Sequence, residues 1–227
     1  MFYFDSTYIL IIIAFALSAF ASFGVNATFS KYKAVESYRG YTGADAARKI
    51  LDDNGLQAVR VEHISGNLND HFDPKSNVIR LSDATYASTS VAAIGVAAHE
   101  AGHAVQHAVG YAPIKLRNSM VPVVNFSTQI SMPLFFIGLI FNFFGLAMLG
   151  VVLFSAALAF QLVTLPVEFN ASNRALSILR NSGMLDPKEL SGARKVLRAA
   201  GMTYVAAAAA SALQLLRLLL IVNRRRD

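Results

Sequence analysis

The chain of 227 residues contains no cysteine. Disulfide bonds, thiolate metal ligands and a cysteine nucleophile are therefore excluded, although this absence says little about the cellular compartment. No internal repeat, low-complexity linker or nucleic-acid-binding module stands out, although the formal net charge is +6. The basic residues are dispersed and are not interleaved with aromatic residues. We therefore expect them to mark membrane topology and contact with anionic lipid, with no nucleic acid partner.

Charged residues are also scarce, at 15% of the chain, whereas hydrophobic residues make up 55%. A helix needs about 20 predominantly apolar residues to cross a bilayer. Four segments meet this requirement, at about residues 8–29, 121–141, 143–165 and 202–222. The sequence thus predicts a mainly α, integral membrane protein in which residues 1–227 form a single membrane-embedded domain.

Two of the four segments have alternative interpretations. The first could be a cleaved signal peptide, because Ala19-Phe20-Ala21 resembles a cleavage site. However, Asp5 precedes it and no Lys or Arg does, so an uncleaved helix is favoured. The last segment carries Arg217 and could lie in the interface, although spanning is favoured. Apart from Arg217 the four segments hold almost no ionisable residue, which argues against a small transporter.

The polar segment 30–119 is large enough for a small α+β insert. Its local patterns predict a helix over 42–54, a strand over 57–64, a loop over 65–76 and a strand over 77–82. We expect the short strands to form a β-hairpin. A strand edge beside the helix that follows would allow an extended peptide to add by backbone hydrogen bonding.

The most informative pattern follows this hairpin. His99, Glu100 and His103 spell HExxH within an apolar, proline-free run over 91–109, preceded by candidate capping residues at 88–90. Histidines four residues apart lie on one face of a helix, so both imidazoles can reach one metal ion. The glutamate can then act as a general base without being a ligand. An inert histidine pair is the alternative, and the pattern favours a metal site.

A zinc enzyme needs a third protein ligand and an open fourth position for water. His107 is a poor candidate, because eight residues of helix separate it from His99 by about 12 Å. Glu168 is better placed, because it directly follows an apolar run where a solvated charge is unexpected. The two central spans form a hairpin, so the segment 166–201 returns to the side of the membrane that holds His99 and His103.

Three residues near the motif have plainer expected roles. Gly102 has no side chain, so another element can pack closely against the metal-binding helix. His63 lies in a polar, strand-like stretch and is expected to be exposed. His107 is expected on the helix surface or lining a pocket.

Four separated motifs resemble those of the YugP-like family of bacterial membrane zinc metallopeptidases, and the likeness covers nearly the whole chain. They are NDHFDP at 69–74, VIRLS at 78–82, VAAHEAGHAVQ at 96–106 and LPVEFNAS at 165–172. The resemblance implies a zincin-like fold with one Zn²⁺ per chain, bound by His99, His103 and Glu168. The chain is also similar, more remotely, to the HtpX and CAAX-prenyl-protease group. That group carries an aspartate where this chain has Ser172, and Asn170 is the nearest amide, so the partner that orients a ligand histidine stays open.

The expected function is that of a gluzincin-like, membrane-bound endopeptidase acting on membrane or membrane-proximal proteins. Glu100 would be the general base, and His71, Tyr86 and Arg174 are candidate donors to the oxyanion. The alternative is a non-catalytic scaffold or adaptor with a structural zinc site, closed by His71 or His107 as a fourth ligand. The sequence carries no feature that sets the oligomeric state or the residue at the cleaved bond.

The distribution of basic residues predicts the orientation in the membrane. Near the span ends on the catalytic side are Lys31, Lys33, Lys115, Arg117, Arg174, Arg180, Arg194, Lys195 and Arg198. The opposite side has only Arg224, Arg225 and Arg226, and only if the last segment spans. We therefore expect a multi-pass protein of the plasma membrane with its active site on the cytoplasmic face and its N-terminus outside.

Overall fold

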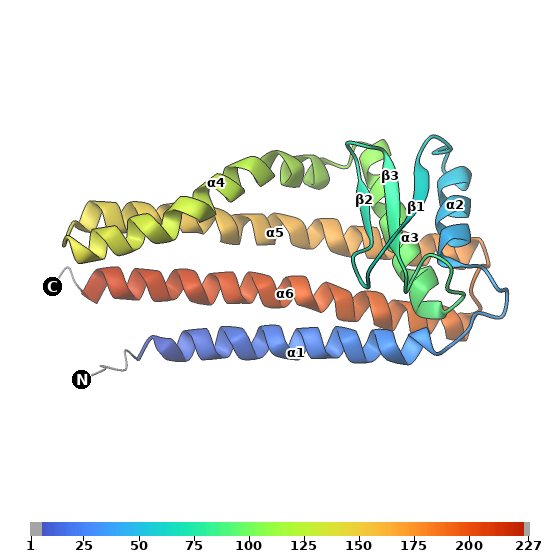
Figure 1. The fold of residues 1–227 in the computed structure, drawn as a ribbon, viewed down its shortest axis with the longest axis horizontal. Helices are drawn as coiled ribbons and strands as arrows, with labels where there is room; N and C mark the ends of the chain where they lie inside the picture. The colour runs from blue at the N-terminus through green and yellow to red at the C-terminus, as the bar shows by residue number, and fades with distance from the viewer. Residues whose placement is uncertain (1–5, 225–227) are drawn as a thin grey trace. The chain divides into compact units, whose positions relative to one another are not determined.

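The computed structural model describes residues 6–224, so Arg225 and Arg226 of the basic tail lie outside the described residues. The fold is mainly helical with one small sheet, which confirms the predicted class. In chain order the elements are α1 (Tyr8–Lys33), α2 (Gly43–Asp53), β1 (Arg60–Ile64), β2 (His71–Asp73), β3 (Val78–Ser82), α3 (Val91–Ala108), α4 (Ala112–Ile140), α5 (Phe144–Asn181) and α6 (Pro187–Arg224) (Figure 1).

The chain separates into two compact units, each of which is described by itself. One unit comprises the described residues through Ser22, the segment Lys115–Pro166 and the described residues from Met202. The other unit comprises Phe23–Ile114 and Val167–Gly201. We call them the helical unit and the site unit, because the second contains all three residues of the expected metal site.

Among residues 6–224, α1, α4, α5 and α6 are long and apolar enough to cross a membrane, in agreement with the four predicted segments. Each of these helices extends, at one end or both, beyond the apolar run that predicted it. Helix α5 continues past residue 165 through Pro166 to Asn181. Helix α6 begins at Pro187, well before the predicted start at 202. Apolar composition marks the part of a helix suited to lipid, but it does not mark where the hydrogen-bonded backbone ends.

Within the helical unit, α4 and α5 form the predicted hairpin. Asn142 makes the turn in the left-handed region, at φ +52°, which asparagine tolerates better than most residues. A Cβ added to Gly138 would lie 2.3 Å from the Ala147 nitrogen, so glycine permits the two helices to approach closely. Arg217, the ionisable residue of the last segment, places its guanidinium carbon 4.8 Å from the centre of the Tyr8 ring.

The sheet of the site unit has the strand order β1-β3-β2. Strands β1 and β3 are parallel, with Arg60 opposite Val78, whereas β2 and β3 are antiparallel, with Phe72 opposite Ile79. The site unit thus contains a short antiparallel hairpin, but its strands are β2 and β3. The strands predicted over 57–64 and 77–82 correspond to β1 and β3, which pair in parallel and cannot form a hairpin. Strand β2 lies inside the stretch expected to be a loop. The sequence did not predict this strand, because three residues are too few to show an alternating pattern.

The two helices of the insert begin where their capping residues predict. Thr42 caps α2 in a capping box, accepting a hydrogen bond from the Asp45 backbone N–H while the Asp45 carboxylate accepts one from the Thr42 N–H. Ser90 caps α3 by accepting a hydrogen bond from the Ala93 N–H.

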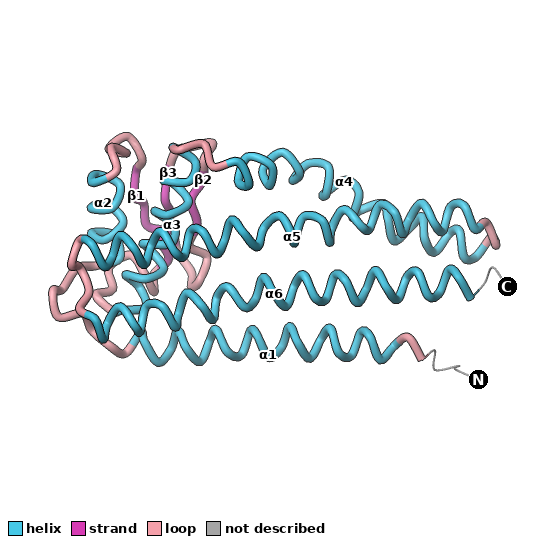
Figure 2. The backbone as a smooth tube through the Cα atoms, turned by 180° about the vertical axis from the view of Figure 1, so that it is seen from behind, coloured by secondary structure: helices cyan, strands magenta, loops and turns pink. Residues whose placement is uncertain are grey.

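Helix α3 is the centre of the site unit and is buried along most of its length. Figure 2 shows the strands gathered beside α2 and α3, and the contacts between these elements agree. The core joins apolar residues of α2, β3, α3, α5 and α6; examples are Ile50, Leu81, Ile94, Leu179 and Leu197. A histidine on this helix is therefore held by packing on several sides, which fixes the direction of its side chain.

Candidate metal centre

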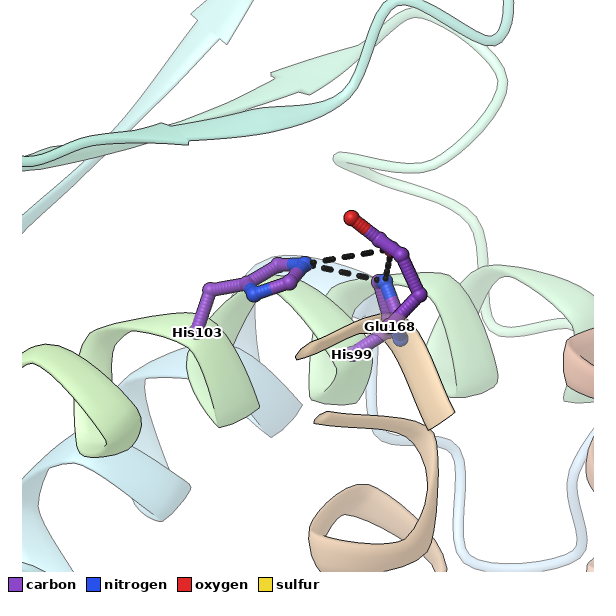
Figure 3. A group of neighbouring side chains, drawn as sticks. All are labelled: His99, His103 and Glu168. Atoms are coloured by element: carbon purple, nitrogen blue, oxygen red, sulfur yellow. Dashed lines mark hydrogen bonds and ion pairs between the residues drawn. The ribbon is translucent and has the colours of Figure 1, made fainter. Parts of the chain in front are cut away.

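Three side chains of the site unit converge on one point. His99 and His103 come from successive turns of α3, and Glu168 comes from α5 (Figure 3). The two Nε2 atoms are 3.1 Å apart. The Glu168 Oε2 atom lies 3.3 Å from the Nε2 of His99 and 3.5 Å from the Nε2 of His103. The structure thus brings together the three residues that the sequence proposed as ligands.

The geometry of this triangle fits a tetrahedral zinc ion. Bonds of about 2.0–2.2 Å to nitrogen and oxygen place neighbouring tetrahedral ligands about 3.3–3.6 Å apart. The three measured separations lie within about 0.2 Å of that range. Two imidazoles and one carboxylate also form a donor set that zinc uses in hydrolytic enzymes.

Burial also suits a cation at this point. Glu168 is only 3% exposed, and a buried carboxylate needs a compensating charge or hydrogen bonds. The two Nε2 atoms face each other, so their lone pairs repel unless a proton or a cation lies between them. Within residues 6–224, these three residues are the group of histidine, cysteine and carboxylate side chains close enough to share an ion, with ligand atoms within 4.8 Å of one another.

Close packing of α3 against α5 places the carboxylate within reach of the imidazoles. A Cβ added to Gly102 would lie 2.8 Å from the backbone oxygen of Ala171. Real Cβ atoms essentially never approach other atoms that closely, so any larger residue would push the helices apart. The role predicted for Gly102 is therefore confirmed.

The second nitrogen of each imidazole also has a partner. The His99 Nδ1 atom lies 3.1 Å from the Ser172 hydroxyl oxygen. Ser172 is thus the partner of His99 that the sequence left open. The His103 Nδ1 atom lies 3.0 Å from Oε1 of Gln106, a residue that sequence reasoning missed. Its spacing of three residues from His103 was the available signal.

The surroundings of His103 are negatively charged. Burial lowers the pKa of His103, but its hydrogen bond to Glu168 and the charges of Glu100 and Glu168 outweigh that effect and raise the pKa above its usual value. Glu100 follows His99 on α3 and is itself only 8% exposed. The expected general base therefore lies near the ligands and largely out of bulk water.

The three candidate oxyanion donors have other partners in the structure. Arg174 donates from Nε to the Asn170 Oδ1 atom at 2.8 Å. His71 is exposed on β2, where its Nδ1 lies 2.9 Å from the Asn69 backbone oxygen. Tyr86 packs against the core, and its ring centre lies 5.4 Å from that of His63.

The other histidines lie where the sequence placed them. His63 is exposed, and its Nε2 lies 2.6 Å from the Asp83 carboxylate. His107 is exposed near the end of α3, with its ring edge toward Phe72 at a centroid distance of 6.0 Å. Neither His71 nor His107 belongs to the metal group among the described residues.

The four candidate spans and the His99–His103–Glu168 group point to the class of membrane zinc metallopeptidases. Residues 7–223 match the family described as "Putative neutral zinc metallopeptidase", and the chain belongs to this family. It is also 49% identical over 218 residues to "Putative membrane protease YugP" of Bacillus subtilis (strain 168), covering 96% of this chain and 97% of that protein. No solved structure matches the chain. The family resemblance carried by the four motifs is thus confirmed.

Proposed function

We propose that the protein is a membrane-bound, zinc-dependent endopeptidase that hydrolyses peptide bonds of membrane or membrane-proximal proteins. The observation that carries the proposal is the convergence of His99, His103 and Glu168, with separations within about 0.2 Å of those that a tetrahedral zinc ion requires. Family membership supports the same activity and the same metal.

The ligand set favours a catalytic over a structural metal site. A structural zinc ion has four protein ligands, whereas a catalytic one has three and leaves a position for water. Only three ligands meet among the described residues. The scaffold alternative needed His71 or His107 as the fourth ligand, and both side chains make their contacts elsewhere.

When bound, zinc supplies Lewis-acid chemistry, which lowers the pKa of water towards 7 and polarises a carbonyl group. The carboxylate of Glu100 takes a proton from the attacking water as its oxygen bonds to the scissile carbonyl carbon. Glu100 then returns that proton to the departing amine as the carbon–nitrogen bond breaks. Glu100 is only 8% exposed, so little bulk water can reach its carboxylate and exchange this proton.

The apolar helix α5 and the distribution of basic residues support the proposed substrate class and the proposed location of the site. The ligand Glu168 lies on α5, a helix long and apolar enough to cross a bilayer. A peptidase whose ligand belongs to such a helix is suited to substrates held at or in the membrane. We propose that all four helices span the plasma membrane and that the site faces the cytoplasm, because basic residues concentrate near the span ends on that side.

The test uses the full chain, purified with zinc, and two substitutions. Glu100→Gln should keep zinc near one equivalent per chain and abolish proteolysis, whereas Glu168→Ala should lose both zinc and proteolysis. Glu62→Gln is the matched control, because Glu62 forms surface ion pairs with Arg60 and Arg80, which contribute little. Cleavage retained by Glu100→Gln refutes the general base, and full zinc occupancy in Glu168→Ala removes Glu168 from the ligand set.

Substrates can be found by comparing peptides from membranes of cells that carry the wild type or Glu100→Gln. Proteins cleaved only by the wild type should carry cleavage sites in or next to membrane-spanning segments. Cleavage sites confined to soluble proteins would contradict the proposed substrate class.

A further inference from the structure

Gln106 is a fully buried amide one turn beyond His103 on α3. Its Nε2 atom donates two hydrogen bonds to α5, to the Val167 backbone oxygen at 2.8 Å and to the Asn170 Oδ1 atom at 2.9 Å. Its Oε1 atom lies 3.0 Å from the Nδ1 of His103. The amide therefore connects the helix that carries Glu168 with one of the two imidazoles.

The chemistry of the partners fixes which end of this amide faces the histidine. The Val167 backbone oxygen can only accept, so the Gln106 atom facing it must be the NH₂ group. The Arg174 Nε–H can only donate, so the Asn170 atom facing it must be the amide oxygen. That oxygen also accepts from Gln106. With the NH₂ group of Gln106 facing Val167 and Asn170, the Gln106 atom that faces His103 must be the amide oxygen.

We propose that Gln106 is a positioning residue that holds the proton of His103 on Nδ1. An amide oxygen can only accept, so it pairs with His103 only when Nδ1 carries a proton. The lone pair of a neutral imidazole then lies on Nε2, the atom that faces His99 and Glu168. The inference rests on the proposed function, since it concerns the same metal site. Asn170 and Arg174 act one step further out, by keeping the Gln106 amide in this orientation.

The two ligand histidines are treated differently by their partners. The hydroxyl of Ser172, which meets His99 Nδ1, can donate as well as accept. It therefore orients the His99 ring without selecting the nitrogen that carries the proton. Of the two groups that meet an Nδ1 atom, only the Gln106 oxygen at His103 is restricted to accepting.

The first test compares Gln106→Met with the wild type in the full-length purified chain. Methionine has a similar length but makes none of the three hydrogen bonds. The dissociation constant for zinc, measured by competition with a chromophoric chelator, should rise about 10- to 100-fold. The visible spectrum of the cobalt-substituted chain should change as well, because the His103 ring is no longer held. Gln57→Met is the matched control: Gln57 is exposed and bonds to the Asp52 backbone oxygen, so its zinc affinity should stay unchanged.

A second pair of variants acts through Asn170, so the inference is tested even where Gln106→Met does not fold. Asn170→Asp keeps an acceptor for both Arg174 and Gln106, so it should bind zinc more tightly than Asn170→Leu. Asn170→Leu removes the acceptor and should weaken binding, by less than Gln106→Met, because Val167 still holds the amide.

The results separate a positioning role from a merely structural one. If Gln106 only joins α3 to α5, its substitution lowers the melting temperature but leaves zinc affinity and the cobalt spectrum of the folded chain unchanged, and the inference is overturned. Equal zinc affinity in Asn170→Leu and Asn170→Asp also overturns it. His99→Ala in the same assay tests the underlying site: unchanged zinc affinity there refutes the proposed ligand set, whereas zinc loss there with no effect of Gln106→Met refutes the positioning role alone.

Discussion

Replacing Gly102 with alanine would test whether the packing of α3 on α5 sets the metal geometry. The added Cβ would lie 2.8 Å from the Ala171 oxygen, about 0.6 Å closer than an ordinary contact of 3.4 Å. Both groups belong to helix backbones, so neither can move away like the end of a flexible side chain. We expect α3 and α5 to separate locally by about this amount.

The cost to stability should be modest, because two effects oppose each other. Overpacking of a tight site typically costs 1–3 kcal/mol, whereas alanine is favoured over glycine inside a helix by about 1 kcal/mol. The net destabilisation is therefore about 0–2 kcal/mol. The metal site should suffer more, because Glu168 precedes Ala171 by one helical turn and would move away from both imidazoles. We expect the zinc dissociation constant to rise at least about 10-fold, by analogy with other losses of ligand orientation.

The matched control is Gly95→Ala on the same helix. There the added Cβ would meet the Ala193 side chain at 3.4 Å, an ordinary contact, so the gain in helix propensity should prevail. Zinc affinity from chelator competition and the melting temperature of the metal-free chain should be measured for both variants. If Gly102→Ala binds zinc as tightly as Gly95→Ala, helix separation does not set the ligand geometry.

Two further predictions concern the histidines. Because the pKa of His103 is raised, the stability of the metal-free chain and its affinity for zinc should change with pH in opposite directions. The stability that protonated His103 contributes is fully present below its ordinary pKa of 6.5 and is lost as the pH rises through the raised pKa. Zinc competes with that proton, so zinc affinity should instead fall as the pH drops through the same range. Melting temperature and zinc affinity recorded between about pH 6 and 9 check this, and parallel curves would contradict it. Ser172→Ala should weaken zinc binding less than Gln106→Met, because the Ser172 hydroxyl orients His99 without selecting its protonated nitrogen; a larger loss in competition titrations would reverse that ranking.

Much of the architecture follows from local sequence patterns. Hydropathy located the four long helices, and the capping residues Thr42 and Ser90 located the starts of two others. The pattern failed where an element was too short, as in β2, whose three residues cannot show alternation. It also failed at the end of α5, because the helix continues past Pro166 although the apolar run stops there.

The candidate site was predictable to the extent that its residues have distinctive chemistry. His99 and His103 follow from their spacing, and Glu168 follows from an even number of expected membrane crossings combined with its apolar context. The sequence does not single out Gln106 in the same way, because a glutamine in a helix is usually expected on the helix surface. Its role depends on a partner on α5, which only the folded chain reveals.

A short stretch of α5 makes most of the contacts between that helix and the residues of the candidate site. Glu168, Asn170, Ala171 and Ser172 lie within about one turn of α5, and each faces the HExxH helix through a different contact. Glu168 is the proposed third ligand, Asn170 holds Gln106, Ala171 sets the distance between the helices and Ser172 meets His99. A rotation or slide of α5 against α3 would disturb all four contacts together. The two helices therefore have one register in which His99, His103 and Glu168 meet.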